Sequence, residues 1–161
     1  MRRVVVTGIG IVSSIGNSAK EVTESLRAGR SGIVFAPDYA EHGFRCRVHG
    51  KPNIDPAEHI DKRTLRFMGD GAAFNFIAMQ QAVADSGLGE REVSNERTGL
   101  IMGSGGPSTK NLFAAQTKVI ETGSPKRMGP FMVTRGMSST NSACLATPFK
   151  IKGLNYSITS A

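Results

Sequence analysis

The chain has 161 residues, 39% of them hydrophobic and 20% charged, which is an ordinary globular composition and enough for one domain with a buried core. Its net charge of +7 attracts polyanions such as nucleic acid, an acidic membrane or an acidic protein. The basic residues are dispersed, and the chain has no Trp and two Tyr, so it supplies few stacking platforms for nucleic acid. An acidic protein partner is therefore the favoured hypothesis.

The sequence also argues against membrane insertion and export. No apolar run reaches the roughly 18 residues that a membrane span needs. The run Val4–Val6, directly after two arginines, is shorter than the roughly 7–15 apolar residues of a signal peptide. We therefore expect a cytoplasmic protein.

The first half of the chain predicts strands alternating with helices. The β-branched run 3–7 is typical of a strand buried on both faces. A capping box, Ser18-Ala-Lys-Glu21, opens a helix that Gly29 ends, and a short strand is expected near 44–48. Apolar residues at three- and four-residue spacing then predict the longest helix, roughly 64–86.

The second half continues the alternation. Residues 98–102 predict a second buried strand, and a weaker helix follows over 109–121. Residues 141–150 predict a helix that runs to Lys150 or ends just before Pro148. The last segment, 154–159, alternates apolar and polar residues and predicts a buried strand. This order predicts an α/β layered fold, with residues 1–161 forming one incomplete unit.

Two glycine-rich motifs need separate interpretation. Val6-Thr-Gly-Ile-Gly10 lacks the third glycine of a dinucleotide fingerprint, because position 13 is Ser, and the acidic residue expected about 20 positions on is also missing. We interpret it as a tight turn. Gly103-Ser-Gly-Gly106 lacks the Gly-Lys-Ser/Thr ending of a P-loop. It predicts either a plain turn or a pocket wall that leaves space for a ligand chain.

Charged and nucleophilic side chains form no recognisable catalytic constellation. Lys62, Arg63 and Arg66 cluster near the start of the longest predicted helix, where cations oppose the helix dipole, so the cluster is either a solvated face or a binding surface. Lys126 and Arg127 form a second basic pair, open to the same two interpretations.

The remaining candidates have simple interpretations. The cysteines, Cys46 and Cys144, lack metal-ligand spacing and are expected to be inert buried thiols. The histidines, His42, His49 and His59, are expected in surface loops. We therefore predict no metal site and no cofactor.

Four stretches together carry a resemblance to a known family: Arg3–Gly16, Leu26–Ile33, Gly99–Gly106 and Ser142–Ala161. The chain resembles the type I β-ketoacyl-[acyl-carrier-protein] synthases of bacterial fatty-acid synthesis. The last stretch is the most specific, because its Leu-Ala-Thr-Pro-Phe-Lys segment is closer to type I than to type II relatives. The similarity covers the whole chain, and since the family's enzymes are longer, it resembles their N-terminal portion.

The resemblance implies a thiolase-like layered fold, of which residues 1–161 are the N-terminal half of a duplicated α-β-α unit. It implies a homodimer in which the strand at 154–160 pairs across the two-fold axis. The implied reaction is the decarboxylative condensation of an acyl thioester with malonyl-[acyl-carrier-protein], an acyltransferase step of fatty-acid elongation. The catalytic cysteine is expected just after Ala161, with two histidines further on, so the chain itself holds no catalytic residue.

Some functional residues carry over by position in the resemblance. Gly106 and Met137 match residues around the acyl chain, with Met137 partly facing the partner's pocket. The surface that receives the acidic acyl carrier protein is matched by Arg45, Lys62, Arg63, Arg66, Lys126 and Arg127. Gly123 stands where a relative carries another arginine, and Pro107 replaces a commoner glycine, which stiffens that loop. A rival interpretation is a non-catalytic homologue that acts as a scaffold or chain-length partner, without the nucleophile.

Overall fold

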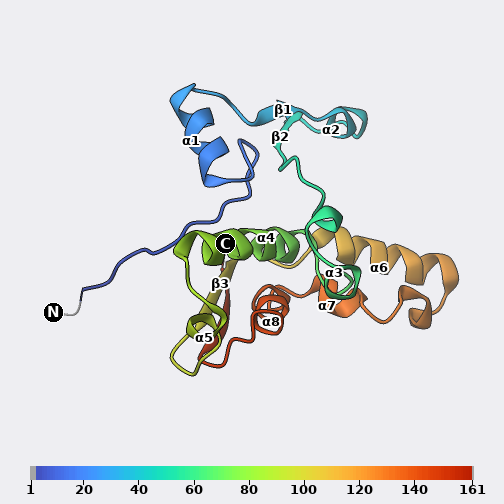
Figure 1. The fold of residues 1–161 in the computed structure, drawn as a ribbon. Coiled ribbons are helices and arrows are strands. Elements are labelled where there is room, and N and C mark those ends of the chain that lie inside the picture. The colour runs from blue at the N-terminus through green and yellow to red at the C-terminus, as the bar shows by residue number, and fades with distance from the viewer. Residues whose placement is uncertain (1–2, 161) are drawn as a thin grey trace.

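Helix α4 (Asp70–Ser86) is the longest helix of the computed structural model, which describes residues 3–160. Figure 1 shows α4 between two groups of elements: α1, β1, β2 and α2 above it, and β3, α5 and α8 below it. Helices α6, α3 and α7 lie together at one end of α4. The helices and strands alternate along the chain, as the sequence predicts, and the structure is a mixed α/β arrangement.

The bounds of the elements follow the chain. The helices are α1 (Ala19–Arg27), α2 (Pro37–Glu41), α3 (Lys62–Leu65), α4 (Asp70–Ser86), α5 (Glu90–Val93), α6 (Thr109–Thr122), α7 (Met132–Gly136) and α8 (Thr140–Ala146), with the 3-10 turns η1 (Pro56–Glu58) and η2 (Pro125–Met128). The strands are β1 (Ile33–Phe35), β2 (Val48–Gly50), β3 (Leu100–Ser104) and β4 (Asn155–Thr159).

The strands form two separate pairs within the described residues. Strands β1 and β2 are antiparallel, with Val34 opposite His49. Strands β3 and β4 are parallel, with Met102 opposite Ser157. The parallel pair needs a long crossover, which α6, α7 and α8 provide between the two strands.

The core lies where α4 meets α8 and β3. Its buried side chains are Ile60, Met68, Ala72, Ala73, Phe76, Ile77, Leu100 and Leu145. Leu145 on α8 has no exposed surface, and Phe76 packs its ring 5.2 Å from that of Phe149. The predicted apolar stripe is confirmed at Met68, Ala72 and Phe76.

The N-terminal segment differs from its prediction. Residues 3–12 form no strand, and Val4 is 91% exposed, so the expectation of a buried strand over 3–7 is wrong in this structure. No strand of the described chain lies beside it to complete its hydrogen bonds. It runs along α4 instead, where the Ile9 N–H donates to Asp85 Oδ2 at 2.9 Å and the Ile11 N–H donates to Gln81 Oε1 at 3.0 Å. Figure 1 shows its first residues extending away from the body.

The predicted helix over 64–86 is interrupted. It is two helices, α3 and α4, joined by residues 66–69. Gly69 is extended (φ −80°, ψ 171°), and a Cβ atom built on it would lie 2.8 Å from the carbonyl oxygen of Arg135. The close passage of the 135 backbone therefore requires glycine here and ends the helix.

This break changes the electrostatics of the basic cluster. Lys62 and Arg63 lie in the last turn of the short helix α3, and Arg66 is its C-terminal cap. Cations are favoured at a helix C-terminus, so the expectation that they oppose a helix dipole is wrong.

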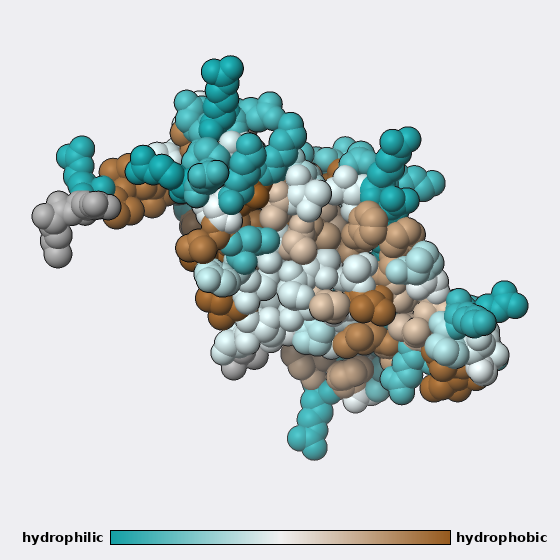
Figure 2. All heavy atoms as spheres, turned by 90° about the horizontal axis from the view of Figure 1, so that it is seen from below, coloured by the Kyte–Doolittle hydropathy of each residue, from teal (hydrophilic) through white to brown (hydrophobic). Residues whose placement is uncertain are grey.

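The outer face of the β3–β4 pair is open in the described residues. Tyr156 and Ile158 are 57% and 58% exposed, and Ile101 on β3 is 68% exposed. The polar face points inward instead, where the Ser157 hydroxyl donates to Ser142 Oγ at 2.9 Å. The strand is present as predicted, but the prediction that it is buried is wrong for this set of residues. Figure 2 shows brown, apolar patches lying open among pale and teal regions on the face seen from below.

We predict that Gly10→Ala destabilises the protein by about 1–3 kcal/mol through overpacking. A Cβ atom on Gly10 would lie 1.7 Å from the backbone oxygen of Ala78 on α4, so one of the two backbones must move. Urea unfolding of the purified protein would measure the change in the free energy of unfolding. Gly103→Ala is the matched control, because no atom lies within 4 Å of its added methyl group. Equal stability of the two variants would contradict the close packing.

Candidate functional site

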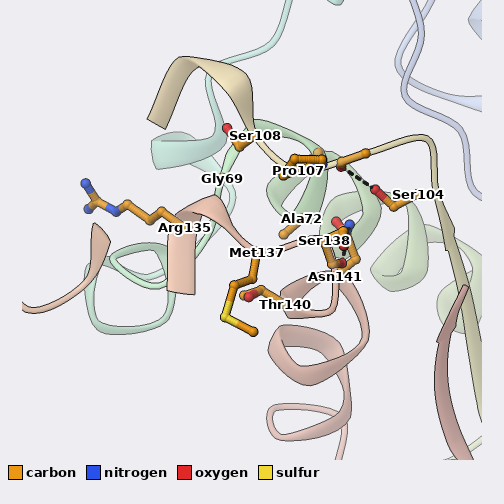
Figure 3. Close-up of a pocket in the computed structure, with 12 residues that line it drawn as sticks. Gly69, Ala72, Ser104, Pro107, Ser108, Arg135, Met137, Ser138, Thr140 and Asn141 are labelled. Carbon is orange, nitrogen blue, oxygen red and sulfur yellow. Dashed lines mark hydrogen bonds between the residues drawn. The ribbon is translucent and has the colours of Figure 1, made fainter. Parts of the chain in front are cut away.

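Gly106 and Met137 line the same cavity, although 31 positions separate them in the sequence. The cavity measures about 150 Å³ and is bounded by the loop after β3, the start of α4, and the α7–α8 junction. Figure 3 shows the Met137 side chain extending beside Thr140 and the Arg135 side chain pointing away. The lining residues are Gly69, Gly71, Ala72, Ser104, Gly106, Pro107, Ser108, Arg135, Met137, Ser138, Thr140 and Asn141.

Hydrogen bonds hold the walls of this cavity in place. The Ser104 hydroxyl donates to the carbonyl oxygen of Gly106 at 2.8 Å, which closes the glycine loop after β3 (Figure 3). The Ser108 N–H donates to the carbonyl oxygen of Gly136 at 3.0 Å and joins the start of α6 to α7. Buried Asn141 donates from Nδ2 to Ser138 O at 2.9 Å at the start of α8. The cavity is therefore a built feature of the fold.

The two predicted pocket residues differ in what they offer a ligand. No atom lies within 4 Å of a Cβ atom built on Gly106, so the absent side chain leaves free space there. Met137 is half exposed, and its flexible thioether chain can adapt to an apolar ligand. Of the two readings of Gly103–Gly106, the geometry favours the pocket wall, because Ser104 and Gly106 line the cavity.

Five of the six predicted basic residues lie on two short elements near α6 and α7. Lys62, Arg63 and Arg66 are on or at the end of α3, and Lys126 and Arg127 are on η2. All five side chains are exposed. Residues 129–131 lead directly from η2 to α7, and Phe131 contacts Arg66, which connects the two elements.

Arg45 is placed apart from the other five. It lies in the segment between α2 and β2, which Figure 1 shows above α4, well separated from α3 and α7. The structure therefore does not bring Arg45 into the surface that contains Arg66.

The predicted basic residues keep their charge unpaired. Within residues 3–160, the ion pairs are Lys110–Asp70, Lys118–Glu121 and Lys150–Glu90. None of these involves the six residues predicted to bind an acidic partner. Asp61, which precedes them, is used as the N-terminal cap of α3: its Oδ1 accepts from the Arg63 N–H at 2.9 Å. A hydrogen bond with the Thr64 side chain, assisted by the backbone N–H groups of Arg63 and Thr64, holds the pKa of Asp61 below its ordinary value.

Three residues next to Arg66 were not identified from the sequence. Phe67 and Phe131 place their rings beside the Arg66 guanidinium, and Arg135 binds the Arg66 carbonyl group. The available signal was weak: an aromatic residue after a Gly-Pro turn, followed by an arginine four positions on. That spacing places both on one helical face, but it does not show what they face.

The cysteines are not arranged as nucleophiles. Cys144 is half-buried on α8, and burial raises the pKa of its thiol, which disfavours the reactive thiolate. Cys46 is exposed, contrary to the expectation of two buried thiols. Among residues 3–160, no three His, Cys, Asp or Glu side chains lie close enough together to hold a metal ion. No helix in the same range has both the length and the apolarity to cross a membrane.

A family model for the N-terminal domain of β-ketoacyl synthases matches residues 1–161. The chain is 50% identical over 161 residues to 3-oxoacyl-[acyl-carrier-protein] synthase 1 of Haemophilus influenzae. It is also 50% identical over 163 residues to the protein of the same name in Escherichia coli K12. In both comparisons the match covers 100% of this chain and 40% of the relative. The chain thus spans less than half the length of these curated relatives.

A solved structure shares the fold. The ishigamide ketosynthase/chain length factor superposes with a TM-score of 0.85 at 26% sequence identity, covering 96% of this chain and 39% of that one. The predicted thiolase-like architecture is thereby confirmed.

We predict that Cys46 reacts with iodoacetamide at least about tenfold faster than Cys144 at pH 8, because Cys46 is exposed and the raised pKa of Cys144 keeps its thiol protonated. Peptide mass spectrometry after timed alkylation would measure both rates. Raising the pH should speed the labelling of Cys144, and unfolding in urea should remove the difference. Faster labelling of Cys144 in the folded protein would contradict this assignment.

Proposed function

We propose that this chain, which belongs to the β-ketoacyl synthase family through its N-terminal domain, is the first portion of a 3-oxoacyl-[acyl-carrier-protein] synthase. The proposed enzyme condenses an acyl thioester with malonyl-[acyl-carrier-protein], with loss of CO2, in bacterial fatty-acid elongation. The observation that carries the proposal is the 50% identity to two synthases of that name along the entire chain. A cytoplasmic location remains the matching expectation.

The first proposed role of this chain is to receive an acidic acyl carrier protein. Support comes from the exposed basic residues of α3 and η2, none of which is paired with an acid in the described chain. Unpaired surface charges of one sign speed and orient the encounter with a partner of opposite sign. Arg45 lies elsewhere, so its contact with the same partner remains a prediction that the geometry does not favour.

The second proposed role is to hold part of the acyl chain. Gly106 leaves open space in the cavity wall, and Met137 contributes a flexible apolar side chain. Apolar surface that leaves water on binding stabilises the complex in proportion to its area, so a cavity of this kind selects chains by length. No cofactor or metal is part of the proposal.

The chemical step is assigned to residues outside this sequence. A cysteine thiolate attacks the acyl thioester carbon and displaces the carrier thiolate. The malonyl group then loses CO2, and its carbanion attacks the enzyme-bound thioester, forming a carbon–carbon bond and releasing the cysteine thiolate. In the proposed enzyme this cysteine follows Ala161, and the α3, η2 and cavity residues act by binding and orientation.

The open sheet face supports a longer polypeptide and a dimer. Ile101, Tyr156 and Ile158 lie exposed on one face of β3–β4, and β4 has a strand partner on one edge only in the described residues. An apolar face and a free strand edge are normally covered in a stable protein. We propose that the remainder of the enzyme covers the face and that β4 pairs with its copy in a homodimer.

A second candidate function is a non-catalytic partner that sets chain length. The observation in its favour is the fold similarity to a solved structure whose name includes a chain length factor, at a TM-score of 0.85. Sequencing the gene beyond codon 161 separates the two. Cysteine at the next position supports the condensing enzyme, and glutamine or another residue supports the partner.

We predict that reversing two charges on α3, with Arg63→Glu and Arg66→Glu together, raises KM for an acyl-carrier-protein thioester about tenfold or more. Activity toward a small thioester without the carrier should change little, since both side chains are exposed. Steady-state condensation assays of the full-length protein at two salt concentrations would measure this. The matched control is Lys20→Glu with Arg27→Glu, which reverses the same number of charges on α1, in the layer above α4 (Figure 1). Equal effects of the two pairs would exclude α3 as the docking site.

We predict that Gly106→Leu shortens the longest acyl chain accepted, because the new side chain occupies free space in the cavity wall without meeting the backbone. Assays with saturated acyl thioesters of increasing length should show a preserved rate for the shortest and a fall of about tenfold or more for the longest. Gly105→Leu is the control: its Cβ position is equally open, but the residue does not line the cavity. An unchanged length profile for Gly106→Leu would refute the pocket role.

A further inference from the structure

Arg66 is the one basic residue of the candidate docking surface that the described chain holds between aromatic rings. Its guanidinium carbon lies 4.9 Å from the centroid of the Phe67 ring and 5.0 Å from that of the Phe131 ring. The two rings meet edge to face, with centroids 5.0 Å apart and an interplanar angle of 83°. A cation at these distances is attracted by the electron-rich ring faces.

The same helix also binds the backbone of Arg66. Arg135 donates from Nε to the Arg66 carbonyl oxygen at 2.8 Å. Phe131 is the N-terminal cap of α7 and Arg135 lies in its last turn, and the Arg135 N–H donates to Phe131 O at 3.0 Å. One turn of helix therefore contacts both the side chain and the carbonyl group of Arg66.

This arrangement suits recognition of an anion. A guanidinium group resting on ring faces keeps its N–H donors directed outward in its own plane, where a carboxylate or a phosphate can accept them. Arg66 remains exposed, whereas Phe67, Phe131 and Arg135 are half-buried, so the support is anchored and the charge is accessible. A long side chain that is already held loses less conformational freedom when it binds.

We propose that Phe131 and Arg135 are positioning residues that hold Arg66 ready for an anionic group of the carrier protein. This inference rests on the proposed function and adds to it a support that the docking surface does not share equally among its cations. Within residues 3–160, the cation–π contacts are both made by Arg66, while Lys62 and Arg63 on the same short helix have no ring beside them.

The test uses Phe131→Leu, which removes the ring face but keeps an apolar side chain, and Phe131→Tyr, which retains the ring. In the full-length protein, Phe131→Leu should raise KM for the acyl-carrier-protein thioester about two- to fivefold, with kcat and the kinetics on a small pantetheine thioester unchanged. Phe131→Tyr should stay within about twofold of wild type. Thermal melting of each variant would show that it is folded at the assay temperature.

A double-mutant cycle assigns the effect to Arg66. Once Arg66→Ala has removed the guanidinium, Phe131→Leu should cause no further rise in KM for the carrier substrate. Additive effects, an equal loss on the small thioester, or a Phe131→Tyr variant as impaired as Phe131→Leu would each overturn the inference. A wild-type protein that fails to condense either substrate would overturn the proposed function and this inference with it, whereas active wild type with an additive cycle would overturn the inference alone.

Discussion

The packing of α4 against α8 and β3 is the constraint on which the rest of the structure depends. Phe76 and Ile77 on α4, Leu145 on α8 and Leu100 on β3 remove their side chains from water at this junction. Burying such side chains stabilises a fold by roughly 1.5–3 kcal/mol each, which makes this junction its main source of stability. Because α4 and α8 are held there, the start of each helix is held too, and both starts form walls of the cavity around Gly106 and Met137.

The break between α3 and α4 links the core to the surface chemistry. Gly69 allows the backbone at Arg135 to pass close to the start of α4, and this passage places α7 beside the end of α3. Arg66 then lies against Phe131 on one side, while Met137, just beyond α7, lines the cavity on the other. A single short helix thus stands between the basic surface and the cavity, so a carrier docked on one would deliver its cargo near the other.

The basic surface and the open sheet face show two different consequences of exposure. The exposed lysines and arginines are stable in water as they are, and they form a surface that an acidic partner can visit and leave. The exposed apolar residues Ile101, Tyr156 and Ile158 favour a permanent cover, because their contact with water is unfavourable for as long as it lasts. One surface therefore suits a transient partner, and the other suits the remainder of the protein or a second copy.

Much of this could be predicted from local sequence, and the remainder could not. The capping serine at 18, the apolar stripe through Met68, Ala72 and Phe76, and the final alternating strand each act through near neighbours, so their patterns were sufficient. The family followed from short motifs, and with it the pairing of Gly106 and Met137. Residues distant in sequence decided the rest: whether residues 3–7 find a strand partner, where helix 64–86 breaks, and that Phe131 and Arg135 hold Arg66. Those outcomes depend on which backbone passes beside which, and periodicity along one segment carries no information about its neighbour in space.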